Sequence, residues 1–194
     1  MNNKEPFDIF SKWINEAQEN SKIVEPTAMC LSTVDEESKP SSRMVLLKKF
    51  DEKGFCFFTN LTSRKGGELD NNQNVALCFY WGSFGRQVRI EGEVEAVSDI
   101  EADDYFASRR RESQIGAWAS KQSQEMASDE EFATRIKESE EKFEGKDVSR
   151  PPFWSGFRCK PTRIEFWEDG DFRIHTRTIY QKSGDAWKIS RIYP

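Results

Sequence analysis

Apolar residues recur at helical spacing near the start of the chain and at alternating positions through much of the rest. Phe7, Phe10, Trp13 and Ile14 predict an amphipathic helix over residues 6–20. Shorter apolar runs bounded by turn residues predict strands, in the ranges 27–34, 43–50, 54–60, 75–81 and 87–97. The last of these runs alternates regularly between apolar and polar residues, which is typical of a strand with one buried face.

The pattern becomes mostly helical over residues 98–145. Ser98 and Glu101 have the spacing of a capping box, and Ser63 is expected to cap a short helix earlier in the chain. Further helices are predicted over about 113–120 and 129–143, and strands return over 154–159, 162–167, 172–181 and 187–192. The predicted order along the chain is strands, then helices, then strands. This order favours a mainly β protein with peripheral helices (α+β), built as an antiparallel barrel or curved sheet. It does not suit a doubly wound parallel sheet.

The size and charge of the chain exclude several classes of protein. Its 194 residues contain no internal repeat and no low-complexity linker, so a single domain over residues 1–194 is predicted. The net charge of −5 argues against a nucleic-acid-binding protein. The longest apolar runs are far below the ~20 residues that span a bilayer, and the N-terminus does not resemble a secretory signal. We expect a cytoplasmic protein with no nucleic-acid or membrane partner.

The cysteines and the one histidine further limit the chemistry. The four cysteines form no C-x-x-C pair, and His175 is the only histidine, so neither a metal site nor a Ser-His-Asp hydrolase is predicted. Three of the cysteines lie in apolar runs and are expected to be buried thiols in a reducing compartment.

Two clusters in the first half of the chain could bind anions. Arg43 and Lys48 lie at the two ends of a predicted strand, and regular alternation would place them on opposite faces. Arg64 and Lys65 follow Ser63 where a strand leads into a helix, and a helix N-terminus attracts phosphate. Each cluster alone is also typical of a solvated strand end or turn.

Two further clusters lie in the second half. Tyr105 and Arg109 are four residues apart and share a helix face, and Ser113 could cap the next helix. In a strand, Arg173, His175 and Arg177 would share one face. Solvent-facing surfaces would explain each cluster singly, but together the four clusters favour a phosphorylated cofactor and a phosphorylated substrate.

Several segments closely resemble the pyridoxamine/pyridoxine 5′-phosphate oxidase family, in the expected order over about residues 7–194. These segments are EPTAMCLSTVD, RMVLLKKFDEKGFCFFTN, SRKGGEL, RQVRIEGEVE, YFASR, SQIGAWASKQSQ, IEFW, RIH and AWKISRIYP. The resemblance implies an FMN-binding split β-barrel that forms a homodimer, with two FMN molecules between the subunits. It also implies an N-terminal helix within residues 1–22 and C-terminal strands, residues 150–194, that complete the active site.

The resemblance implies roles for individual residues. FMN would contact Arg43, Met44, Val45, Leu46, Phe58, Thr59, Arg64, Lys65, Gln87, Gln122, Ser123, Trp167 and Arg177. The substrate phosphate would be held by Lys48, Tyr105, Arg109 and Ser113. The implied catalytic pair is Arg173 and His175, which would lie over the substrate ring.

The implied enzyme is a pyridoxal 5′-phosphate synthase. It would oxidise pyridoxamine 5′-phosphate, and pyridoxine 5′-phosphate, by hydride transfer from the substrate C4′ atom to flavin N5, and O2 would be reduced to H2O2.

The chain departs from the family pattern at a few positions. A segment that closes over the substrate usually precedes the first helix, and we expect it to be absent here because the helix is reached by Phe7. Thr176 stands where Asp is common, Arg110 where Pro is usual, and Ser155 where Gly is usual. The missing segment and Thr176 support an alternative, a catalytically weak relative that binds FMN or pyridoxal phosphate. A flavin or nitro reductase is a third possibility, although it has no need of the substrate-phosphate residues.

Overall fold

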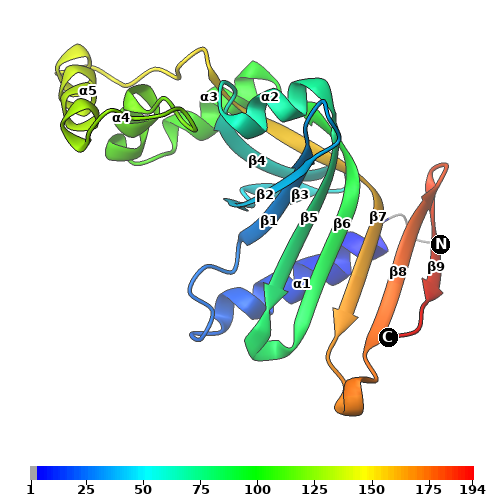
Figure 1. Ribbon diagram of the computed structural model, residues 1–194. Helices are drawn as coiled ribbons and strands as arrows, with labels where there is room; N and C mark the ends of the chain where they lie inside the picture. The colour runs from blue at the N-terminus through cyan, green and yellow to red at the C-terminus, as the bar shows by residue number, and fades with distance from the viewer. Residues whose placement is uncertain (1–3) are drawn as a thin grey trace.

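The computed structural model describes residues 4–194, which form a curved antiparallel sheet with helices at one end and along its inner face (Figure 1). The helices are α1 (Glu5–Glu19), α2 (Arg64–Asn71), α3 (Asp99–Ala107), α4 (Arg111–Ala119) and α5 (Asp129–Lys142), with short 3-10 turns η1 (Gly82–Phe84) and η2 (Asp171–Arg173). The strands are β1 (Ala28–Val34), β2 (Pro40–Leu46), β3 (Lys49–Asp51), β4 (Gly54–Asn60), β5 (Asn74–Trp81), β6 (Arg86–Ala96), β7 (Trp154–Glu168), β8 (Thr176–Ser183) and β9 (Ala186–Arg191).

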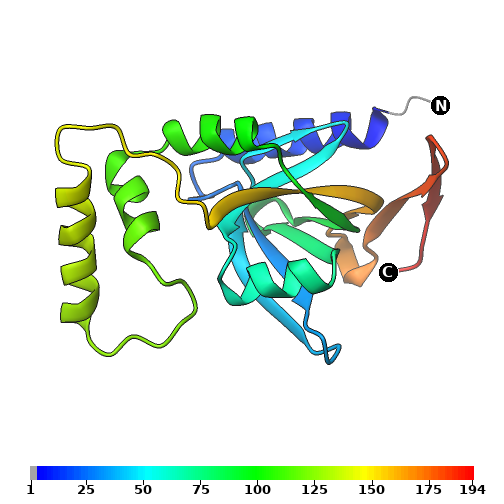
Figure 2. The same cartoon turned by 90° about the horizontal axis from the view of Figure 1, so that it is seen from above.

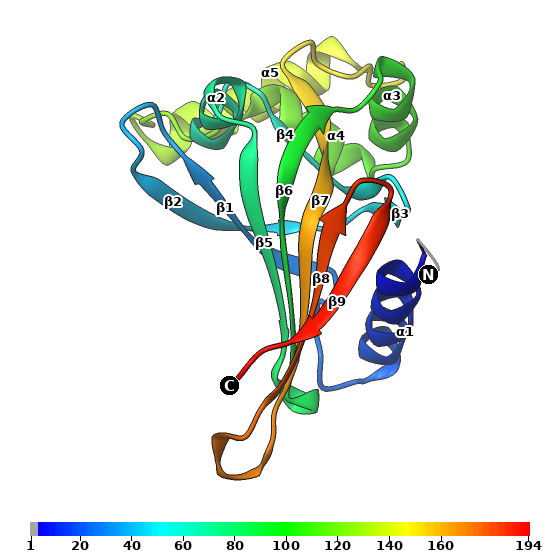
Figure 3. The same ribbon diagram turned by 90° about the vertical axis from the view of Figure 1, so that its right-hand side faces the viewer.

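The long strand β7 is the centre of the sheet. The strand order is β2-β1-β5-β6-β7-β4-β3, and β8 and β9 extend from β7 as well. The first half of β7 pairs with β4 and its second half pairs with β8, while β6 runs along nearly its whole length. The sheet therefore divides at β7, and the two branches leave in different directions (Figure 3). This divided antiparallel sheet confirms the predicted fold class.

Helix α1 supplies the core on the inner face of the sheet. Phe10 is fully buried, and its ring contacts the rings of Phe50, Phe55 and Phe79 at centroid distances of 4.9–5.1 Å. Burying large aromatic surfaces in this way accounts for the stability of a chain that is only 36% hydrophobic. The opposite face of β5–β8 keeps partly exposed residues, including Tyr80, which is 66% exposed.

Helices α3, α4 and α5 gather at one end of the molecule around Trp154, the first residue of β7 (Figure 2). Phe106, Ile115, Phe143 and Val148 form a second buried cluster with it. The η2 turn lies beyond the other end of β7, away from these helices, and the β8–β9 hairpin runs back alongside the second half of β7 (Figure 1). No helix in residues 4–194 is long and apolar enough to cross a membrane.

Most predicted elements are present, including the Ser63 cap and the Ser98–Glu101 capping box. The separate strands predicted over 154–159 and 162–167 are one strand, β7, because a register shift between Glu91 and Gly92 accommodates Pro161. A Cβ at Gly92 would lie 2.2 Å from the Lys160 carbonyl oxygen, so only glycine fits there.

Three local predictions were wrong. The strand expected over 43–50 ends at Leu46, so alternation does not decide where Lys48 points. Ser113 is not a cap, because α4 begins at Arg111 and places Ser113 inside the first turn. The strand expected from residue 172 begins at Thr176; Arg173 has a φ of +66° in the η2 turn, so it does not share a strand face with His175 and Arg177. The predicted absence of a segment before α1 involves residues 1–3, which lie outside the described residues.

Candidate active site

A cavity of about 1020 Å³ lies where β2 and β4 meet α2, α3 and α4. It is lined by most of the residues that the sequence singled out: Arg43, Met44, Val45, Leu46, Lys48, Phe58, Thr59, Arg64, Lys65, Tyr105, Arg109, Ser113, Gln122 and Ser123. These residues come from five helices and strands and three loops, so the fold alone brings them together. The volume is at the upper end for small-molecule sites, which suits more than one ligand.

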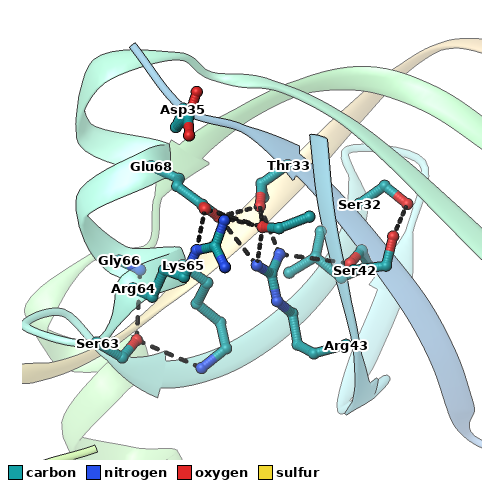
Figure 4. Close-up of polar contacts among 12 residues, drawn as sticks. Ser32, Thr33, Asp35, Ser42, Arg43, Ser63, Arg64, Lys65, Gly66 and Glu68 are labelled. Atoms are coloured by element: carbon teal, nitrogen blue, oxygen red, sulfur yellow. Dashed lines mark hydrogen bonds and ion pairs between the residues drawn. The ribbon is translucent and has the colours of Figure 1, made fainter. Parts of the chain in front are cut away.

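One wall of the cavity is a network around the buried carboxylate of Glu68 (Figure 4). Arg43 Nη2 donates to Glu68 Oε2 at 2.9 Å, and Arg64 Nε donates to Glu68 Oε1 at 2.8 Å. The hydroxyls of Thr33 and Ser41 donate to the same carboxylate. Burial opposes ionisation of Glu68, but these hydrogen bonds outweigh it and lower its pKa to about 2. Glu68 therefore stays charged and fixes both guanidinium groups in place.

Lys65 lies beside this network and points toward the loop after α4. Its Nζ donates to Gln122 Oε1 at 2.7 Å, to Thr59 Oγ1 at 3.0 Å and to Ser63 Oγ at 3.3 Å. Burial, and secondarily the charge of Arg43, lower the pKa of Lys65 to about 8. All three acceptors are neutral, so the ammonium group has no anionic hydrogen-bond partner among the described residues and is well placed to receive one from a ligand.

The other end of the cavity combines stacked aromatic rings with Arg109. The rings of Phe58 and Tyr105 stack at 4.1 Å, and Trp154 stacks against Phe58 at 5.4 Å. The Arg109 guanidinium lies 5.0 Å from the Trp154 ring centre, and its buried Nη1 has no hydrogen-bond partner within residues 4–194. Burial lowers the pKa of Arg109. A buried guanidinium nitrogen without an acceptor is costly, and an oxyanion in the cavity would satisfy it.

The remaining predicted residues lie at the far end of β7. Gln87, Trp167 and Arg177 are direct neighbours across β6, β7 and β8, and His175 and Arg173 lie just before β8. Trp154 and Trp167 are separated by 13 residues of one strand, which corresponds to roughly 40 Å along the chain. One chain therefore holds two separate groups, which we call the cavity group and the far group; the far group consists of Gln87, Trp167, Arg173, His175 and Arg177.

Arg177 and His175 each have an acidic partner. Arg177 Nε donates to Glu165 Oε1 at 2.7 Å, and Glu165 is fully buried. Burial opposes ionisation of Glu165, but hydrogen bonds from Arg177 and Arg163 lower its pKa. His175 Nδ1 lies 3.0 Å from Asp169 Oδ1. Both side chains therefore have a carboxylate partner, with threonine at residue 176 between them.

Sequence reasoning missed Glu68, Glu165 and Asp169. The i,i+4 spacing of Arg64 and Glu68 on one helix was a usable signal for the first. Glu165 and Arg177 come together only through the pairing of β7 with β8, which no local pattern indicates.

Comparisons with known proteins agree with this geometry. Residues 16–143 match the family model described as pyridoxamine 5′-phosphate oxidase, and residues 154–194 match the pyridoxine 5′-phosphate oxidase C-terminal dimerisation region. A pyridoxine/pyridoxamine 5′-phosphate oxidase of Rhodospirillum rubrum is 49% identical over 199 residues, covering 100% of this chain and 98% of the relative. One from Rubrobacter xylanophilus is 48% identical, covering 98% of this chain and 87% of the relative.

Solved structures show the same fold. PhzG from Burkholderia lata, in complex with tetrahydrophenazine-1-carboxylic acid, has a TM-score of 0.91 and 30% identity, covering 97% of this chain and 92% of that one. A pyridoxamine 5′-phosphate oxidase-related, FMN-binding protein from Nostoc punctiforme has a TM-score of 0.76 at 16% identity, covering 94% of this chain and 96% of that one.

The divided antiparallel sheet and its cation-lined cavity define a split β-barrel protein. Within that class, the chain belongs to the pyridoxamine 5′-phosphate oxidase family. This membership confirms the resemblance stated from the sequence and supports FMN as the cofactor.

Proposed function

We propose that this protein oxidises pyridoxamine 5′-phosphate and pyridoxine 5′-phosphate to pyridoxal 5′-phosphate, with FMN as cofactor and O2 as electron acceptor. The observation that carries the proposal is one cavity with two cationic regions from different elements. Arg43, Arg64 and Lys65 form one region, and Lys48 and Arg109 form the other. Two phosphate groups, one on the cofactor and one on the substrate, match this arrangement.

The first region fits the FMN phosphate. Arg43 and Arg64 are already oriented by Glu68, so they lose little conformational freedom on binding. Lys65 adds a point charge from the first turn of α2, where free N–H groups favour anions. Met44, Val45, Leu46, Phe58, Thr59, Gln122 and Ser123 are proposed to contact the rest of the cofactor.

The second region fits the substrate phosphate. The unpartnered Nη1 of Arg109 supplies a buried donor, and Lys48, Tyr105 and Ser113 line the same cavity. Anchoring the phosphate holds the substrate ring in one position, which makes the reaction effectively intramolecular. The stacked rings of Phe58, Tyr105 and Trp154 supply an apolar wall of this region.

Bound FMN would supply the electron acceptor for the hydride that leaves the C4′ carbon. The protein residues bind and orient the substrate. Arg173 is exposed in the η2 turn and is proposed to reach the substrate ring and stabilise developing charge. His175 is proposed to lie near C4′ and to assist removal of the proton from the amine or hydroxyl group that C4′ carries.

The far group would meet the cavity group of a second copy. Exposed apolar side chains concentrate in the matched dimerisation region, including Phe172 (95%), Ile174 (69%) and Tyr193 (93%). Surfaces of this kind are typical of protein–protein contacts. We therefore propose a homodimer in which Gln87, Trp167, Arg173, His175 and Arg177 complete the partner's site. The single domain over residues 1–194 and the cytoplasmic location expected from the sequence are parts of the same proposal.

The test is an anaerobic titration of the FMN-loaded protein with pyridoxamine 5′-phosphate, followed by the visible flavin absorbance. Prompt bleaching that air restores is expected. A flavin that binds but stays oxidised would contradict the oxidase and favour the alternative of a binding protein. Bleaching by NADPH but not by pyridoxamine 5′-phosphate would favour a reductase. Unphosphorylated pyridoxamine is the matched control, because it lacks the group that Arg109 is proposed to bind.

A further inference from the structure

The only histidine of the chain is held by a carboxylate from the same hairpin. His175 Nδ1 lies 3.0 Å from Asp169 Oδ1, and its ring lies 4.6 Å from the ring of Trp167. Asp169 Oδ1 also accepts a hydrogen bond from the backbone N–H of Gly170 at 3.0 Å. The imidazole therefore lies between an aromatic ring and a carboxylate oxygen.

The geometry admits two positions for the imidazole proton. In the first, the Gly170 N–H donates to His175 Nδ1 at 3.3 Å, and Nδ1 carries no proton. That arrangement would place the Nδ1 lone pair against a carboxylate oxygen at 3.0 Å, which is repulsive. In the second, Nδ1 carries the proton, the carboxylate oxygen at 3.0 Å would accept it, and the Gly170 N–H would keep its hydrogen bond to the same Oδ1 at 3.0 Å. The contacts therefore favour the Nδ1–H form.

The position of Asp169 is itself determined by close packing. Its backbone N–H donates to the Gly85 carbonyl oxygen at 2.7 Å, which ties the end of β7 to the η1 turn. Gly85 has a φ of +59°, and a Cβ built there would lie 2.7 Å from Asp169 Cβ. A glycine is needed at residue 85 for Asp169 to reach this position.

We propose that Asp169 is a positioning residue that holds His175 with its proton on Nδ1 and presents Nε2 as a hydrogen-bond acceptor. Nε2 has no hydrogen-bond partner within residues 4–194, so it is available to a ligand. This role rests on the proposed function, in which His175 lies near the reacting carbon. A carboxylate on one ring nitrogen sets the tautomer and orientation of the other.

The interaction contributes little to folding, because the Asp169 side chain is 62% exposed and exposed ion pairs are weak. A role in positioning and a role in stability therefore predict different results. Asp171 provides a matched control, since it is an exposed carboxylate in the same turn with no side-chain partner among the described residues.

The test is nitrogen NMR of the ¹⁵N-histidine-labelled full-length protein, in which His175 gives the only imidazole signals. At a pH where the ring is neutral, we expect the proton on Nδ1 in the unmodified protein and in Asp171→Ala. In Asp169→Ala the proton should move to Nε2, because the Gly170 N–H becomes the remaining partner of Nδ1. An Nε2–H tautomer in the unmodified protein, or an unchanged tautomer in Asp169→Ala, would overturn the proposal.

Kinetics provide the second readout. Asp169→Ala should lower kcat for pyridoxamine 5′-phosphate roughly 10-fold, the low end of the effect that partners of metal-binding histidines have, with a smaller change in KM and in FMN affinity. Gly85→Ala should shift the tautomer in the same direction without changing charge. If the protein does not oxidise pyridoxamine 5′-phosphate at all, the proposed function fails, while the NMR result still decides the role of Asp169.

Discussion

Lys65 should make FMN binding depend on pH. Its pKa is lowered to about 8, first by burial and then by Arg43, and a phosphate dianion beside Nζ would raise it again. Above pH 8, binding must therefore take up a proton, and FMN affinity should fall by up to about 10-fold per pH unit. Fluorescence titrations of FMN between pH 7 and pH 10 would measure this slope.

The matched variants for this prediction are Lys65→Gln and Lys137→Gln. Lys65→Gln should bind FMN more weakly at pH 7 and show no slope above pH 8. Lys137 is an exposed residue of α5, so its substitution should leave both properties unchanged. The same slope in Lys65→Gln as in the unmodified protein would exclude Lys65 from the phosphate site.

Glu68 should contribute to stability at neutral pH but not in acid. Its pKa is about 2 in the folded protein, against 4.5 for the free side chain, so the folded state favours the charged form. This contribution of about 3 kcal/mol is complete above pH 4.5 and is lost as the pH falls toward 2. Glu68→Gln should therefore be less stable than the unmodified protein at pH 7, by urea unfolding, and the gap should be about half as large at pH 3.

The control for Glu68 is Glu138→Gln, an exposed residue of α5. It should unfold like the unmodified protein at both pH values. A stability gap for Glu68→Gln that does not shrink in acid would mean that packing, and not the charge network with Arg43 and Arg64, explains the loss.

At the scale of the element, α2 offers two adjacent glycines with different surroundings. A Cβ at Gly66 would lie 2.0 Å from the Leu61 carbonyl oxygen, whereas a Cβ at Gly67 would have no atom within 4 Å. Gly66→Ala should destabilise the fold by about 1–3 kcal/mol and weaken FMN binding, because the first turn of α2 must move. Gly67→Ala should raise stability by up to about 1 kcal/mol, because alanine favours helix. Thermal unfolding and FMN titration would separate the two.

The elements were largely predictable because local patterns determine them. The Ser63 cap and the Ser98–Glu101 capping box mark helix starts correctly. The errors occur where contacts that the apolar pattern does not report determine the backbone. The continuity of β7 depends on a register shift in β6, and the η2 turn depends on Gly170, whose Cβ would lie 2.2 Å from the Ile174 carbonyl oxygen. The first contact joins segments that are far apart in the sequence, and the second is a local close approach that no apolar pattern indicates.

At the scale of the molecule, the separation of the cavity group from the far group predicts complementation. Lys65→Ala disables the first group, and Arg173→Ala disables the second. Unfolding and refolding an equal mixture should form mixed dimers, in which one of the two sites has no substitution. Activity should then recover to about a quarter of that of the unmodified protein, because half of the dimers are mixed and half of their sites are intact.

Activity in the mixture no higher than the mean of the two separate variants would mean that each site draws on one chain only. Dimer exchange can be monitored independently with differently tagged chains, so a failure to mix is recognised as such.

The composition of the cavity group was predictable from sequence, since its residues match family motifs. The separation of the cavity group from the far group was not predictable from sequence. It arises because β7, an extended strand of 15 residues, places the two groups at its opposite ends. The contacts of Glu68 with Arg43 and of Glu165 with Arg177 were missed for a related reason, because only the fold brings these residues together.

The exposed residues of the dimerisation region have one more consequence. If each site needs two chains, dilution that separates the dimer also takes its active sites apart. Specific activity should therefore fall once the chain concentration drops below the dimer dissociation constant. FMN bound between the chains would oppose this loss, so a shortage of cofactor would also loosen the assembly. Supply of the vitamin that provides the flavin would thus control how much vitamin B6 enzyme exists in assembled form.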